Sequence, residues 1–84
     1  MYMNDVQLFI YYQFISLIDN PTEVVEVNFN VKSPKHLDVL FQVNFLLGTT
    51  MSVKGNTVTT LIDAKTVKKL IILAGKNPEL IKAL

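Results

Sequence analysis

Alternating hydrophobic and polar side chains mark residues 24–31 as a β-strand. Successive side chains of a strand point to opposite faces, so this period predicts one buried and one solvated face. Later in the chain, apolar residues recur at intervals of three and four, which predicts a helix with one apolar stripe. That stripe consists of Val67, Leu70, Ile71 and Ala74.

A hairpin is predicted just before this helix. The turn 54–56 separates two runs rich in β-branched residues, 49–53 and 57–62. Its glycine and asparagine tolerate the positive φ that a tight hairpin turn requires. Asp63 follows as a helix N-cap, because its carboxylate can accept from the unpaired N–H groups of the first turn. Gly75 is predicted to end the helix.

Two further segments fit more than one period. In residues 35–47, hydrophobic and polar residues alternate well enough for a strand, which would form a long hairpin with the strand before it. The apolar residues of the same segment also fit one face of a helix. Ser33 and Pro34 before the segment and Gly48 after it favour the helix. Residues 77–84 fit a last strand or a short helix capped by Asn77, and the pattern does not choose between them.

The N-terminal segment 1–20 is apolar on most sides. A helix is favoured over an extra strand, although short apolar runs fit both. Left exposed, it would form the kind of patch that marks an interaction site, so we expect burial against its own domain or a second subunit. Phe9, Tyr12 and Phe14 are the candidate interaction residues. Pairing at a sheet edge or covering an open sheet face would also bury the segment.

Composition excludes several classes of protein. The 84 residues carry a net charge of +1 and no arginine, so nucleic acid is not an expected partner. The chain has no cysteine, which fits a cytoplasmic protein. The apolar run 6–18 is shorter than the roughly 20 residues of a membrane span and lacks signal-peptide flanks. No metal-ligand or catalytic motif is recognisable, so we expect no cofactor and no enzyme.

The order strand, helix, hairpin, helix, with Asp63-Ala64-Lys65-Thr66 opening the second helix, resembles the histidine-containing phosphocarrier protein (HPr) family of the bacterial sugar phosphotransferase system. Short, diverged clostridial-type members are the most similar, and the resemblance covers residues 24–76. It implies an α+β fold, an open-faced sandwich with a four-stranded antiparallel sheet and helices on one face. Residues 21–84 would form this domain, preceded by the segment 1–20.

The resemblance also implies site residues. A histidine at the start of the first helix accepts a phosphoryl group in phosphorylating members, and His36 lies at that helix start. A serine near the start of the second helix is a regulatory phosphorylation site, and Thr66 takes its place. Leu37 and Asp38 follow His36 where phosphorylating members have an arginine and a proline.

Two functions are therefore predicted. The first is a diverged HPr-like phosphocarrier or regulatory protein with phosphotransferase-system proteins as partners. The alternative is a non-catalytic module that kept only the fold and binds other proteins or forms a homodimer.

Overall fold

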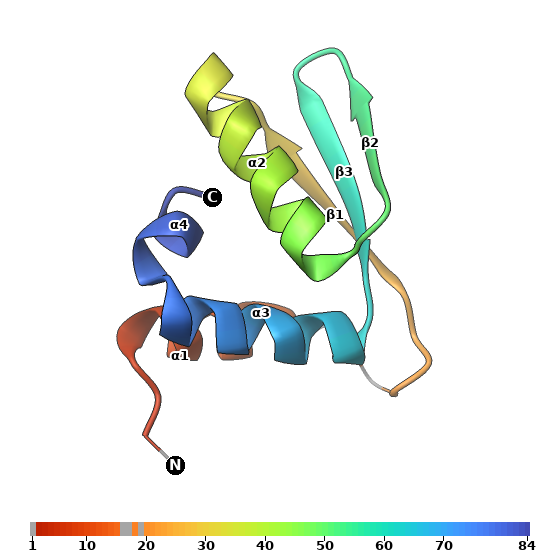
Figure 1. Ribbon diagram of the computed structural model, residues 1–84. Helices are drawn as coiled ribbons and strands as arrows, with labels where there is room; N and C mark the ends of the chain where they lie inside the picture. Colours follow the sequence, from red (N-terminus) through yellow and green to blue (C-terminus); the bar gives the residue numbers. More distant parts are fainter. Residues whose placement is uncertain (1, 16–17, 19) are drawn as a thin grey trace.

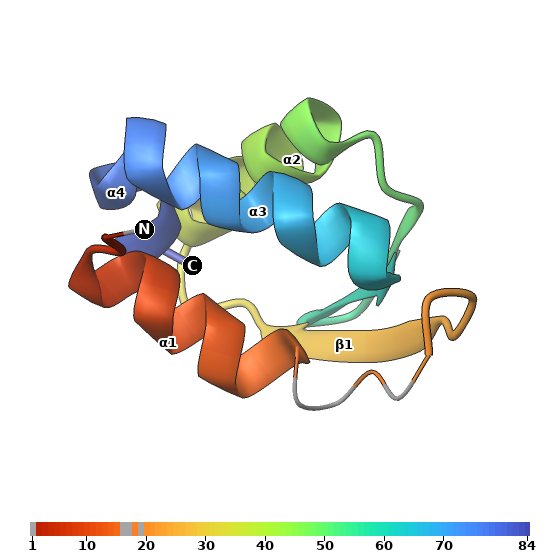
Figure 2. The same cartoon turned by 90° about the horizontal axis from the view of Figure 1, so that it is seen from below.

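The computed structural model describes residues 2–15, 18 and 20–84, which fold into helices on one side of a small sheet (Figure 1). The elements are α1 (Asp5–Phe14), β1 (Val25–Asn30), α2 (Pro34–Leu47), β2 (Met51–Lys54), β3 (Thr57–Ile62), α3 (Ala64–Lys76) and α4 (Pro78–Lys82). The strands form an antiparallel sheet in the order β1-β3-β2. The helices gather on one side of it, as the view from below shows (Figure 2). The predicted α+β open-faced sandwich is confirmed.

The register of the sheet separates an apolar from a polar face. Val27 lies opposite Thr60 and Phe29 opposite Val58, and these side chains face the helices. The intervening residues of β1 are exposed, and on the open face the Thr59 hydroxyl donates to Asn28 Oδ1 at 2.6 Å. The open face is therefore mostly solvated and polar, and most of the exposed large apolar side chains lie on the helices instead.

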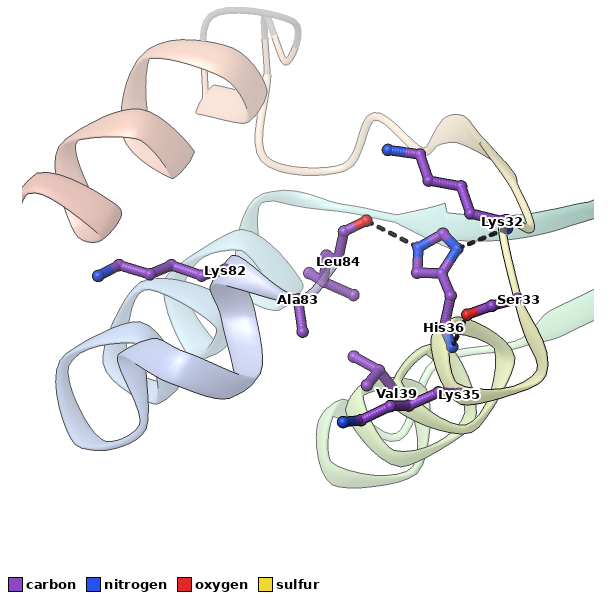
Figure 3. Close-up of a pocket in the computed structure, with 8 residues that line it drawn as sticks. All are labelled: Lys32, Ser33, Lys35, His36, Val39, Lys82, Ala83 and Leu84. Atoms are coloured by element: carbon purple, nitrogen blue, oxygen red, sulfur yellow. Dashed lines mark hydrogen bonds between the residues drawn. The ribbon is translucent and has the colours of Figure 1, made fainter.

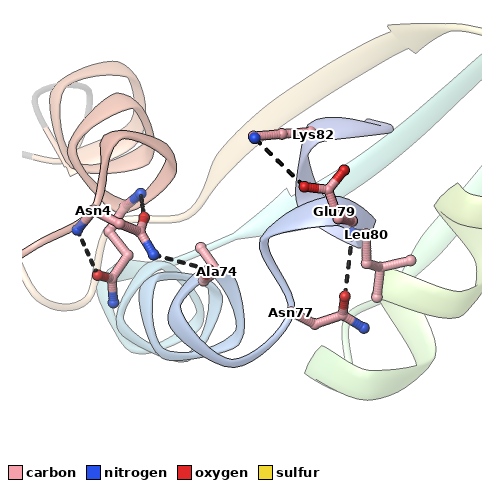
Figure 4. A network of polar contacts seen from close by, with 7 residues as sticks. Asn4, Ala74, Asn77, Glu79, Leu80 and Lys82 are labelled. Carbon is pink, nitrogen blue, oxygen red and sulfur yellow. Dashed lines mark hydrogen bonds and ion pairs between the residues drawn. The ribbon is translucent and has the colours of Figure 1, made fainter.

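The segments whose period was ambiguous are all helical. Ser33 caps α2, its Oγ accepting from the His36 N–H, and Gly48 ends that helix with a left-handed φ of 68°. Asn77 caps α4 by accepting from the Leu80 N–H at 3.3 Å (Figure 4). The fourth strand that the family resemblance implies does not occur in the described part of the chain, because this tail turns into α4.

The favoured helix in the N-terminal segment is confirmed as α1. Asn4 and Gln7 form a reciprocal capping box at its start. The same side chains bind α3, since the Gln7 amide donates to the Ile71 carbonyl at 2.9 Å. The Asn4 amide donates to the Ala74 carbonyl at 3.4 Å, as Figure 4 shows. The hypothesis that this segment pairs at a sheet edge or covers the open face is wrong. The predicted segment 1–20 also includes residues 1, 16, 17 and 19, which lie outside the described residues.

The prediction that Gly75 ends its helix is also wrong. The helix continues to Lys76, and Gly75 has no positive φ. A Cβ atom at this position would lie 2.7 Å from Gln7 Nε2. The glycine instead allows the close approach of α1 that the hydrogen bond from Gln7 to Ile71 requires.

The core lies between the sheet and the helices. One side of α3 supplies its centre, with Val67, Leu70 and Ala74 buried. Residues from every other helix and from β3 pack around this side: Ile10, Val43, Leu47, Ile62 and Ile81. Since α1 contributes Ile10, the N-terminal helix shares one core with the rest of the chain.

A buried polar network connects α2 to β3. The Asn44 amide nitrogen donates to the Leu40 carbonyl at 2.7 Å. Its Oδ1 accepts from the hydroxyls of Thr49 at 2.5 Å and Thr60 at 3.0 Å. Buried polar groups that lose their partners destabilise a fold, so this asparagine holds the helix, the following loop and the sheet in one arrangement.

We expect Asn44→Ala to lower the free energy of unfolding by about 2–4 kcal/mol, because it leaves the buried Thr60 hydroxyl without its acceptor. Urea unfolding followed by circular dichroism measures the change. Gln42→Ala, on the exposed side of the same helix, is the control and should shift the value by less than about 0.5 kcal/mol. Equal effects of the two substitutions would contradict this role for Asn44.

Candidate functional site

The outer side of α1 presents an apolar surface to solvent. Ile10 is only 1% exposed, whereas Phe9 and Tyr12 are 60% and 68% exposed. Leu8 and Tyr11 are exposed beside them, and the Tyr11 and Tyr12 rings make an edge contact at 5.7 Å between centroids. We call Leu8, Phe9, Tyr11 and Tyr12 the α1 surface.

The composition of α1 explains why this surface exists. A helix that is apolar on all sides is normally buried on all sides. Here one side packs on α3, and the exposed polar residues of the helix are only Asp5 and Gln13. Large exposed apolar patches on soluble proteins mark sites where another molecule binds.

A groove of 350 Å³ runs along one border of the α1 surface. Phe9 and Phe14 line it from α1, Phe29 lines it from β1, and Ile81 lines it from α4. Of the three interaction residues predicted from the sequence, Phe9 and Phe14 thus lie in one groove, and Phe14 is half-buried against the core. Tyr12 lies on the exposed side of the helix, outside the groove lining.

The candidate phosphoryl acceptor lies at the start of α2 (Figure 3). His36 is the third residue of this helix, and its side chain is buried, with the residue 9% exposed. Its Nδ1 lies 3.0 Å from the Lys32 backbone nitrogen, and its Nε2 lies 2.8 Å from the Leu84 main-chain oxygen. The imidazole therefore bridges two segments that are far apart in the chain.

These contacts determine which nitrogen carries the proton. The Lys32 N–H can only donate, so Nδ1 must be the acceptor. The neutral ring then has its proton on Nε2, which donates to the Leu84 oxygen. Attack on phosphorus requires a ring nitrogen with a free lone pair. In this tautomer only Nδ1 has a lone pair in the ring plane, and that lone pair accepts the hydrogen bond from the Lys32 N–H. Phosphoryl transfer to His36 would require the ring to leave one of these partners.

A pocket of 290 Å³ lies beside this ring. Three lysines line it, Lys32, Lys35 and Lys82, of which Lys82 also lies 3.5 Å from the Glu79 carboxylate. Asp38 is exposed and does not line the pocket, because side chains two residues apart on a helix point in different directions. The pocket is therefore basic, even though an aspartate follows His36 by two residues.

The candidate regulatory residue Thr66 lies in the first turn of α3. Its N–H and its hydroxyl both donate to Asp63 Oδ1, at 2.8 and 2.9 Å. These two bonds, the backbone one foremost, lower the pKa of Asp63 below its usual 3.8. The Thr66 side chain thus takes part in the helix cap, and it lines neither of the pockets described above.

The structure does not bring His36 and Thr66 into one site. It adds residues that were not among the predicted site residues: Leu84 as the partner of His36, and Leu8 and Tyr11 in the α1 surface. Tyr11 had a sequence signal, since it belongs to the aromatic run 9–14. Leu84 had none, because 48 positions separate it from His36.

Comparison of the chain with protein-family models, curated proteins and solved structures finds no match. The resemblance to the HPr family stays a prediction. Within the described ranges, no helix combines the length and the apolar character needed to cross a bilayer.

We expect the contribution of Asp63 to stability to depend on pH. Because its pKa is lowered in the folded state, acid favours the unfolded chain; the contribution is full above the usual value of 3.8 and is lost as pH falls through the lowered pKa. Asp63→Asn should therefore be destabilising at pH 6, by a margin that shrinks below pH 3.8. Urea unfolding of both proteins across this range measures the difference.

Thr66→Val is the matched control for this measurement. It removes the hydroxyl donor but keeps the backbone donor, so most of the pH dependence should remain. A difference between wild type and Asp63→Asn that stays constant from pH 6 to pH 2.5 would contradict the assignment.

Proposed function

We propose that this protein is a small non-catalytic module that binds another protein chain through the α1 surface. The observation that carries the proposal is a helix whose solvent side is almost wholly apolar and aromatic. Tyrosine is enriched among the residues that contribute most of the binding energy at protein interfaces, and phenylalanine is enriched in interface cores. The polar open face of the sheet offers no comparable surface.

The chemistry of the α1 surface favours a protein over other partners. Helix α1 carries one carboxylate, Asp5, and no basic side chain. Anionic lipid surfaces and nucleic acid phosphates attract lysine and arginine, which this helix lacks. We place this function in the cytoplasm, in agreement with the absence of cysteine.

A second candidate is an HPr-like phosphocarrier or regulatory protein, with phosphotransferase-system proteins as partners. The basic pocket beside His36 at the start of α2 favours it, because lysines and a helix N-terminus attract phosphate. Phosphorylation of Thr66 belongs to the same candidate. The hydrogen bonds at both His36 nitrogens are the reason that we prefer the binding module.

Photo-crosslinking in the producing cells tests the preferred function. We expect p-benzoylphenylalanine at Tyr12 to give a discrete covalent adduct with a protein, which mass spectrometry identifies. The control places the same residue at Phe45, which is 86% exposed on α2 and thus more open to random collisions. Equal or weaker crosslinking from position 12 would contradict the proposal.

A phosphorylation assay tests the second candidate. With phosphoenolpyruvate and enzyme I, we expect no acid-labile phosphate on the protein, since neither His36 nitrogen is free to attack. Acid-labile phosphate that disappears in His36→Ala would establish the carrier function instead. A circular dichroism spectrum of His36→Ala checks that the variant is folded, because its ring contacts Lys32 and Leu84.

A further inference from the structure

We infer that the groove beside α1 binds a medium-chain fatty acid, with the acyl chain in the groove and the carboxylate at the lysines of the basic pocket. This ligand site goes beyond the proposed protein partner and does not rest on it. It is supported by the position of the groove next to the basic pocket, by the change in chemistry between them, and by the few polar groups that the groove offers.

The groove and the basic pocket adjoin each other, since Lys82 and Leu84 line both of them. Leu84 lies between α4 and the His36 ring, as Figure 3 shows. A small cavity of 30 Å³ adjoins the groove on the side of the core, because Phe14, Phe29 and Leu84 line both. Leu84 thus lines all three spaces, so a long and narrow ligand can reach from one to the next.

The chemistry of these spaces changes from basic to apolar. Three lysines line the basic pocket, whereas phenylalanine and aliphatic side chains make up most of the groove lining. In the small cavity, the side chains of Asn44 and Thr60 already hydrogen-bond to each other, so the cavity suits an apolar group as well. A ligand that matches this order has a negative group at one end and a hydrocarbon chain at the other.

The lysines are able to bind a carboxylate. No acidic side chain is among the described residues that line the groove or the basic pocket. Glu79 contacts Lys82 at 3.5 Å, but both side chains are exposed, and exposed ion pairs contribute little to stability. A ligand carboxylate can therefore compete for Lys82, and the charges of Lys32 and Lys35 attract it as well.

The size of the groove and its few polar groups favour a single acyl chain. Its 350 Å³ lies near the lower end of the range for small-molecule sites, roughly 300–1,000 Å³, which leaves room for one chain rather than the two of a phospholipid. Among the described lining residues, only Gln13 and Lys82 have polar side chains. An extended peptide would leave backbone N–H and C=O groups without partners here, whereas a hydrocarbon chain needs none.

Isothermal titration calorimetry with soluble amphiphiles tests the site. We expect one decanoate to bind per protein chain with a dissociation constant below about 1 mM. Decyltrimethylammonium has the same chain with a cationic head, and it should bind at least about tenfold more weakly. Octanoate should also bind about tenfold more weakly than decanoate, because each CH₂ group lost from an apolar site weakens binding about fourfold.

Lys82→Glu tests the position of the carboxylate. It should weaken decanoate binding at least about fivefold and strengthen binding of the cationic probe, since attraction becomes repulsion at the same place. Lys69→Glu is the matched control, because it makes the same change of net charge at an exposed position of α3 that lines none of the three spaces. It should change either affinity less than about twofold. Circular dichroism melting curves check that both variants are folded.

Nuclear magnetic resonance locates the acyl chain. In nitrogen-15-labelled protein, decanoate should shift the amide signals of Phe29, Ile81 and Leu84, which line the groove, and leave those of β2 unchanged. Shifts confined to Leu8 and Tyr11 would show partition onto the α1 surface outside the groove and would overturn the inference.

Three calorimetric results would overturn it too: no saturable decanoate binding below about 1 mM, equal affinities for the two heads, or equal weakening by the two lysine variants. The fatty acid site and the protein partner can fail separately, because Tyr12, the crosslinking position, does not line the groove.

Discussion

Burial of one side of α3 is the interaction on which the other elements depend. Val67 and Ala74 are fully buried, and Leu70 between them is nearly so. The sheet lies against this side through β3, and the other three helices pack around it. In a domain of 84 residues the surface is large relative to the core, so the helices and β3 depend on their contact with α3, and β1 and β2 are held through their pairing with β3.

The position of α1 follows from this arrangement and leads to the proposed function. Hydrogen bonds from Asn4 and Gln7 to carbonyls near the end of α3 orient the helix, and Gly75 lets it approach closely. These contacts occupy only one side of a helix that is apolar on nearly every side. The remaining side stays in solvent, where burial by another chain would gain free energy from the hydrophobic effect.

The polar residues inside the helical layer serve the fold through their hydrogen bonds. Asn44 joins α2 to β3 through a hydrogen bond with Thr60. His36 joins the start of α2 to Leu84, which lies 48 positions later in the sequence. Both side chains satisfy groups that would be costly to leave unpaired in a small core. For His36 these hydrogen bonds oppose phosphoryl transfer to the ring, since a ring nitrogen that is already hydrogen-bonded is not available as a nucleophile.

The sequence alone determined the elements whose signals are local. The alternation in 25–30, the turn at 54–56 and the Asp63 cap all act through neighbouring residues, and they predicted β1, the hairpin and the start of α3. Only the tertiary structure decided which side of α1 faces solvent, because the pattern of a helix that is apolar on nearly every side does not specify an orientation until α3 buries one side. The partners of His36 and Asn44 were likewise undetermined, since they come from distant positions that only folding brings together.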